Sequence, residues 1–388
     1  MVASPWIAAQ RVAAFSATLG LILSLILLIP DISSAKVTGP CSNCHTMHNS
    51  QGGSSMHTGY GADEGPYGTL LRTNGCVGCH ASNDSAEWKN SLGAPIVYSA
   101  SGASSNPLAG GNYYWVMNAG YGDAYGHNPF ELGNTDGVLS APPGGPGHEF
   151  QVRCSGGGGG PGAGARGCHG NRFLDYEDAE HDACIKGFHH QNEGGELTTA
   201  NTIGNSFRGI WGVKGYEDPD WEQETTTTKH NRYSGATSPS ETTCGGSCHA
   251  PIGWHGETPE YDTISGFCAA CHGHFHQLDR NAYGQVEYGF GGTQSNGQWI
   301  RHPSDILLPQ TGEYNGYPAY SAEAPVGYTD VSIPTRATAV VTCISCHRAH
   351  GSPYPDMLRW NYNDMNAGGG TNTSGCFTCH TEKDTGGS

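Results

Sequence analysis

The chain has 388 residues, enough for one large domain or two to three ordinary ones, and its formal net charge is −17. Its 18 Lys and Arg against 35 Asp and Glu, with no basic cluster, argue against binding to nucleic acid phosphates or to an anionic membrane surface. Leu, Ile, Val and Phe together make up only roughly 15% of the residues, below the level typical of globular chains. Aliphatic packing alone therefore cannot form the core over most of this length.

The N-terminus has the pattern of an export signal. Arg11 precedes an apolar run from Val12 to Ile29, Pro30 ends it, and Ser33–Ala35 offers the small residues that a signal peptidase reads. We expect residues 1–35 to be a cleaved signal peptide. The alternative is an uncleaved membrane anchor, because the run reaches the lower length limit of a spanning helix. Either form places the remaining chain in an oxidising compartment.

The sequence Cys-x-x-Cys-His occurs five times and is the attachment pattern of c-type haem. Two thiols add to the two vinyl groups of one porphyrin, and the His that follows becomes the proximal iron ligand. Zinc would need a second ligand pair at a fixed distance, and no common distance recurs. The five motifs comprise Cys41, Cys44 and His45; Cys76, Cys79 and His80; Cys268, Cys271 and His272; Cys343, Cys346 and His347; and Cys376, Cys379 and His380.

One further Cys-His pair has a slightly longer insert. Three residues separate Cys244 from Cys248-His249, and the glycines between them can absorb the extra residue without moving either sulfur. We expect haem attachment here as well.

A second unusual pair has a much longer insert. Thirteen residues, mostly Gly, separate Cys154 from Cys168-His169, and a flexible loop of this kind closes at modest entropic cost. The alternative is a disulfide across the Gly-rich loop. Haem is favoured because His169 directly follows the second Cys. The sum is seven haem c sites that use 14 of the 15 Cys, with Cys184 left over.

The histidine count predicts electron transfer rather than catalysis. Seven proximal His leave 13 of the 20, enough for seven bis-His haems, whereas only five Met follow the initiator. A six-coordinate iron has no open position for a substrate and carries electrons. Lys replacing the motif His, a mark of a catalytic haem in this class, is absent.

Spacing indicates which histidines act as distal ligands. His48 and His350 each lie three residues beyond a motif His and would share its helix face, so they should reach the iron of a neighbouring haem. One residue of the pair His189 and His190 is expected to ligate, and His276 is preferred over His274. The other candidates are His57, His230, His255 and His302, whereas His127, His148 and His181 are expected to be ordinary surface residues.

The two ends of the chain repeat one pattern, Cys-x-x-Cys-His-x-x-His followed by a Leu-Arg pair (Leu71-Arg72 and Leu358-Arg359) and a second attachment motif. Each end is therefore interpreted as a two-haem module. The expected order is a two-haem module at 36–98, a Gly-rich segment with one odd-spaced haem at 99–170, a connecting region at 171–243, a two-haem module at 244–300, a loop region at 301–342 and a two-haem module at 343–388.

The expected fold class is mostly irregular coil with short α-helices wrapped around a chain of closely stacked haems, with little β-sheet. No sustained period-two pattern occurs, and the longest helix is expected around Asp175 to His190. The haems themselves would supply the apolar core, so folding should depend on haem insertion.

The doubled motifs and the segments Cys343 to Arg359 and Gly209 to Glu222 resemble multihaem c-type cytochromes of the doubled-motif type, over roughly 36–80 and 171–388. The resemblance implies bis-His electron-transfer haems and a periplasmic or outer-surface location. Some similar cytochromes polymerise into filaments in which a His of one subunit ligates a haem of the next. The insert at Cys154 departs from the family pattern.

The sequence therefore predicts an exported seven-haem cytochrome that passes electrons along bis-His haems to an extracellular acceptor, with redox proteins and copies of itself as partners. The alternative is a multihaem reductase of nitrite, hydroxylamine or a sulfur oxyanion with one open haem. An open iron gives a high-spin ferric signal, whereas a purely bis-His protein gives low-spin signals only.

Overall fold

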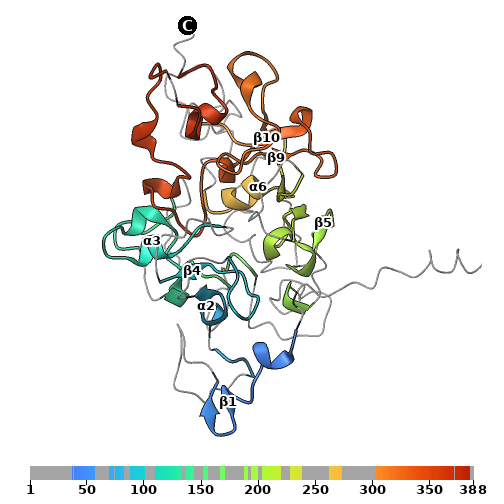
Figure 1. The fold of residues 1–388 in the computed structure, drawn as a ribbon, viewed down its shortest axis with the longest axis vertical. Helices are drawn as coiled ribbons and strands as arrows, with labels where there is room; N and C mark the ends of the chain where they lie inside the picture. Colours follow the sequence, from blue (N-terminus) through green and yellow to red (C-terminus); the bar gives the residue numbers. More distant parts are fainter. Residues whose placement is uncertain are drawn as a thin grey trace, which may run out of the picture.

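The molecule is elongated, with the strand β1 (Ser50–Gln51) at one end of its long axis and the C-terminal residues, in red, at the other (Figure 1). No helix in the described part of the chain is long and apolar enough to cross a membrane. The computed structural model describes residues 37, 39–56, 70–73, 75–82, 88–100, 110–132, 136–143, 152–155, 167–170, 188–190, 194–199, 203–219, 228–237, 262–272, 302–370 and 372–384.

The helices are short and most have 3-10 geometry. The α-helices with described bounds are α2 (Cys76–Cys79), α3 (Tyr114–Met117) and α6 (Ile264–Ala269). The 3-10 helices are η1 (Cys41–Asn43), η2 (Asp123–Tyr125), η3 (Phe130–Leu132), η5 (Ile203–Asn205), η6 (Phe207–Gly209), η7 (Gly312–Gly316), η8 (Arg336–Thr338), η9 (Cys343–Ser345), η10 (Pro355–Met357), η11 (Tyr362–Asp364) and η12 (Gly375–Thr378).

Short helices occur at every regular attachment motif, as predicted. The helices η1, α2, α6, η9 and η12 each contain or begin at a motif Cys. Of the predicted helix around Asp175 to His190, residues 188–190 are helical and the part before them lies outside the described residues. The prediction of mostly coil with short helices is confirmed for the described ranges.

A small mixed sheet lies in the C-terminal half, with strand order β5-β6-β7-β9-β10-β8. Strands β7 and β9 pair in parallel, with Tyr233 opposite Gly327, and the other neighbours are antiparallel. Each strand has two or three residues, too few for an alternating pattern to be visible in the sequence. The strands are β1, β2 (Ser54–Ser55), β3 (Ala81–Ser82), β4 (Tyr98–Ser99), β5 (Gly195–Leu197), β6 (Gly215–Glu217), β7 (Arg232–Ser234), β8 (Ile306–Leu307), β9 (Gly327–Tyr328) and β10 (Ala339–Val341).

Apolar packing is divided among small clusters rather than gathered in one core. One cluster lies against β9 and β10 around the buried Leu308 and Tyr328, and a second contains the buried Phe207 and Val213. A third cluster, around Val77, lies in the N-terminal half of the chain. This distribution agrees with the low aliphatic content of the chain.

The repeated pattern at the two ends of the chain forms the same backbone pairing twice. The Arg72 N–H donates to the Cys44 carbonyl at 2.9 Å, and the Arg359 N–H donates to the Cys346 carbonyl at 2.8 Å. Each copy also forms an antiparallel bridge between its motif His and the Leu of its Leu-Arg pair, namely His45 with Leu71 and His347 with Leu358. The Leu-Arg pair therefore anchors the backbone beside the attachment motif.

Candidate haem sites

Every described attachment motif makes one common backbone hydrogen bond, from the N–H of the His to the carbonyl of the first Cys. The bond closes the short helix and fixes both thiols and the imidazole relative to one another. Its N···O distances are 2.8 Å for His45 to Cys41, 3.0 Å for His80 to Cys76, 3.0 Å for His272 to Cys268, 3.1 Å for His347 to Cys343 and 3.0 Å for His380 to Cys376.

The site with the thirteen-residue insert makes the same bond. The His169 N–H donates to the Cys154 carbonyl at 2.9 Å, and the Cys168 N–H donates to the Arg153 carbonyl at 3.0 Å. A parallel bridge between Arg153 and Gly167 brings the two ends of the insert together. The insert is therefore looped out, and its Cys and His residues have the backbone arrangement of a regular motif. No disulfide joins any of the described cysteines.

Each of five motif histidines faces one other imidazole at a nearly constant separation. The planes within a pair vary widely in angle, so stacking does not set the distance. The ring centroids are 6.1 Å apart for His45 and His190 (24° between planes), 6.2 Å for His80 and His189 (51°), 6.2 Å for His169 and His350 (57°), 6.1 Å for His272 and His127 (45°), and 6.1 Å for His380 and His302 (87°).

This separation fits an iron ion between the two rings. With metal–nitrogen bonds of about 2.0 Å and about 1.1 Å from the nitrogen to the ring centre, two imidazoles on opposite sides of one ion have centroids about 6.2 Å apart. Direct ring contact gives much shorter values, as for His230 and Tyr320 at 3.7 Å. The donor set, two thiols and two imidazoles per site, thus fits a six-coordinate haem c.

Hydrogen bonds fix the orientation of the facing imidazoles. In five of them, and in the motif residue His347, Nδ1 contacts a backbone carbonyl, which leaves Nε2 directed at the position of the iron. The Nδ1···O distances are 2.8 Å for His80 to Pro95, 3.0 Å for His169 to Arg208, 2.8 Å for His272 to Pro143, 2.8 Å for His347 to Asp356, 2.7 Å for His127 to Ala349 and 3.0 Å for His302 to Pro303.

The environment keeps several of these imidazoles neutral, the form that binds iron. Burial lowers the pKa of His80 and of His272 to about 4. Burial, reinforced by the nearby His169, lowers the pKa of His350 to about 3. At physiological pH these ligands need no deprotonation before they bind.

The structure places three histidines in surroundings that the sequence did not specify. His127, expected at the surface, is partly buried and faces His272. His230, a candidate ligand, is fully buried and its ring stacks on Tyr320. His189 and His190 face two different motif histidines, whereas only one of the pair was expected to ligate.

Two predicted ligands follow the motif His at a turn rather than on a helix. His350 faces His169 of another attachment site, as expected, and not His347. It does so from a turn, because helix η9 already ends at Ser345. His48 has a φ of 58° and is exposed. Within the described residues, His347 has no facing imidazole. The predicted residues outside the described ranges are Cys184, Cys244, Cys248, His249, His57, His148, His181, His255, His274 and His276.

The segment from Ala349 to Gly351 supports two sites at once. Its His350 N–H donates to the Gly110 carbonyl at 2.7 Å, and its Gly351 carbonyl accepts from the Asn112 N–H at 2.9 Å. The Ala349 carbonyl accepts from His127 Nδ1. One short segment therefore presents His350 to His169 and orients His127 toward His272.

Gly111 makes this close approach possible. Its φ is +93°, and a Cβ there would lie 2.0 Å from the Gly351 carbonyl oxygen. We expect Gly111→Ala to lower the free energy of unfolding by about 3 kcal/mol, because the backbone of one segment must move. Denaturant unfolding followed by haem absorbance measures this loss.

Gly93→Ala is the matched control, because Gly93 has a φ of +79° but open space around it. Its cost should be only about 1 to 2 kcal/mol, the penalty of the left-handed conformation. Equal losses in the two variants would contradict the close-approach interpretation.

The first two attachment sites lie beside each other. The Arg72 N–H donates to the Cys44 carbonyl at 2.9 Å, and the hydroxyl of Thr73, the next residue, lies 3.7 Å from the Cys79 sulfur. Residues 72 and 73 therefore join the two sites.

Two attachment sites also lie beside each other toward the C-terminus. The Cys343 N–H donates to the hydroxyl of Ser265, which lies on α6, at 3.2 Å. Helix α6 packs against η9, so the sites at 268–272 and 343–347 are in direct contact.

Comparisons with known proteins agree with the motif pattern. Residues 337–385 match the family model described as "Doubled CXXCH motif". The chain is 25% identical over 365 residues to the "C-type cytochrome OmcS" of Geobacter sulfurreducens, an alignment that covers 83% of this chain and 78% of the relative. These matches confirm the resemblance to multihaem c-type cytochromes and identify haem c as the cofactor of the sites.

Two solved structures are also similar to the chain. "Outer Membrane Cytochrome S Filament from Geobacter Sulfurreducens" is 20% identical with a TM-score of 0.42, over 84% of this chain and 85% of that one. "Cryo-EM of the OmcS nanowires from Geobacter sulfurreducens" is 18% identical with a TM-score of 0.39, over 91% of this chain and 94% of that one.

Proposed function

We propose that the chain is an exported seven-haem c-type cytochrome that conducts electrons along bis-His haems toward an extracellular or outer-surface acceptor. The five imidazole pairs at 6.1 to 6.2 Å carry this proposal. When bound, haem c supplies an iron couple that takes up and releases one electron. The residues of the chain hold an imidazole on each side of that position and so exclude a substrate. This favours an electron carrier over a reductase.

The oxidised protein should therefore give low-spin ferric EPR signals from its bis-His sites. Cyanide or nitrite should leave these signals unchanged. A high-spin ferric signal that shifts on adding nitrite would instead support a reductase with one open haem.

The proposed count of seven includes the two unusual attachment pairs. The site of Cys154 and Cys168 is supported by its regular backbone hydrogen bond and by the facing His350. The site of Cys244 and Cys248 rests on the sequence alone, where His249 directly follows the second Cys.

If haem is attached at the long insert, substitution of its two cysteines should remove one haem from the protein. A Cys154→Ala, Cys168→Ala double variant should lose the mass of one haem, because both thioether bonds are removed there and the other sites keep theirs. Intact mass spectrometry of the secreted protein measures the loss. Cys184→Ala, which removes the cysteine left over from the seven pairs, should keep every haem. A double variant with an unchanged haem number would show that the pair attaches none.

Self-association is proposed for the N-terminal end. His48, Met47, Leu70 and Leu71 are exposed beside the first motif, so an imidazole and an apolar patch lie on one surface. This end and the C-terminal module lie at opposite ends of the long axis (Figure 1). Head-to-tail contact would extend the line of attachment sites from one copy into the next. Redox partner proteins and the extracellular acceptor complete the proposed pathway.

A further inference from the structure

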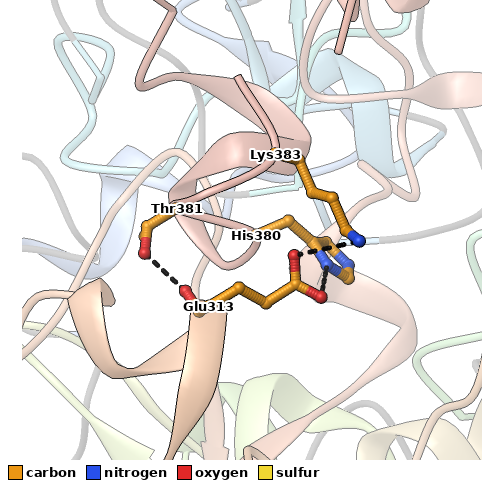
Figure 2. A network of polar contacts seen from close by, with 4 residues as sticks. All are labelled: Glu313, His380, Thr381 and Lys383. Atoms are coloured by element: carbon orange, nitrogen blue, oxygen red, sulfur yellow. Dashed lines mark hydrogen bonds and ion pairs between the residues drawn. The ribbon is translucent and has the colours of Figure 1, made fainter. Parts of the chain in front are cut away.

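A carboxylate contacts the proximal histidine of the last attachment motif. Glu313 lies on η7, and its Oε1 is 3.3 Å from His380 Nδ1 (Figure 2). The other carboxylate oxygen, Oε2, is 3.7 Å from Lys383 Nζ. The Glu313 side chain is only 18% exposed, so water screens this contact weakly.

Four other motif histidines direct Nδ1 at an uncharged acceptor. The Nδ1 atoms of His80, His169, His272 and His347 all contact neutral backbone carbonyls. These four sites can therefore be compared with the site of His380. The ligands are similar, but only the His380 Nδ1 is described beside a carboxylate.

The carboxylate is held in place by its surroundings. The Glu313 carbonyl accepts from the N–H of Thr381 at 3.1 Å and also from the Thr381 hydroxyl. The ring of Tyr314, next on η7, lies 5.1 Å from the ring of His380. The backbone of η7 is therefore tied to the residue after His380, which keeps the carboxylate against the imidazole (Figure 2).

We propose that Glu313 is a positioning residue that lowers the reduction potential of the haem held by Cys376 and Cys379. A negative charge at Nδ1 makes the imidazole a stronger donor through Nε2, which stabilises the ferric over the ferrous ion. Lys383 opposes the effect by partly neutralising the carboxylate. The inference rests on haem attachment at this motif, as proposed above.

Two charge substitutions with opposite signs test the proposal on the full-length secreted protein. Glu313→Gln keeps the size and shape of the side chain but removes its charge, and should raise the potential of this haem. Lys383→Met removes the opposing charge and should lower it. We expect about a tenfold change in the ratio of reduced to oxidised haem at a fixed potential, equivalent to about 59 mV for a one-electron couple.

The signal to follow is an EPR signal titrated against potential. The imidazole planes of His380 and His302 are 87° apart, which predicts a highly anisotropic low-spin signal, distinct from that of the nearly parallel pair His45 and His190 at 24°. Glu196→Gln, the same substitution at an exposed position on β5, should leave that signal's midpoint unchanged.

The proposal would be overturned if Glu313→Gln and Lys383→Met shifted the midpoint potential in the same direction, or if neither shifted it. A merely structural role would change the potential in the same direction in both variants. Peptide mass mapping separates this failure from a failure of the proposed function. Haem on the peptide of Cys376 and Cys379 without a potential shift refutes the tuning alone. Absence of haem from that peptide in the unmodified protein refutes the attachment itself.

Discussion

Replacing His350 with glycine should convert one haem of the oxidised protein from low spin to high spin. His350 faces His169 at 6.2 Å, and within the described residues no other imidazole faces His169. Gly cannot supply a ligand, so the iron held by Cys154 and Cys168 would lose its sixth ligand. The low-temperature EPR spectrum should show one high-spin ferric signal, and added imidazole should restore the low-spin form by entering the space left by the side chain.

Leu308→Ala serves as the control for this variant. Leu308 is fully buried in the apolar cluster against β9 and β10, so its truncation should lower stability without producing a high-spin signal. An unchanged spin state in His350→Gly, with haem still attached to Cys168, would exclude His350 as the axial ligand.

The second large effect is expected at His48, where substitution by Ala should abolish chain elongation while each copy keeps all its haems. His48 is exposed on the N-terminal surface, where its imidazole can reach a haem site of another copy. Under the proposed self-association, negative-stain images should show filaments of the unmodified secreted protein and only monomers of the variant.

Ser54→Ala, an exposed substitution on the neighbouring strand β2, should elongate normally. The haem number of both variants should equal that of the unmodified chain, by intact mass. Filaments of ordinary length from His48→Ala would show that contacts other than this imidazole join the copies.

Local patterns made the attachment sites predictable from the sequence. Cys-x-x-Cys-His fits within one helical turn, so spacing alone specified five sites and their short helices. The Leu-Arg pairs were recognised as a repeat, and the structure adds the pairing that they form, such as Arg72 with Cys44. Haem attachment at the long insert was also predicted from a local feature, because His169 directly follows Cys168.

The distal ligands could not be derived in the same way because their partners are far apart in the sequence. His127 lies in a Gly-rich turn and faces His272, which only the folded backbone brings near it. His350 faces His169, although the two residues are far apart in the sequence. The six-stranded sheet was missed because strands of two or three residues leave no periodic signal.

The segment from Ala349 to Gly351 imposes an order on biogenesis. Synthesis proceeds from the N-terminus, so Cys168 is made long before the residue that faces its histidine. Until residues 349–351 are made, His169 has no His350 opposite it, and His127 lacks the carbonyl that orients its ring. A chain that stops before Ala349 would therefore have incomplete centres in its first half.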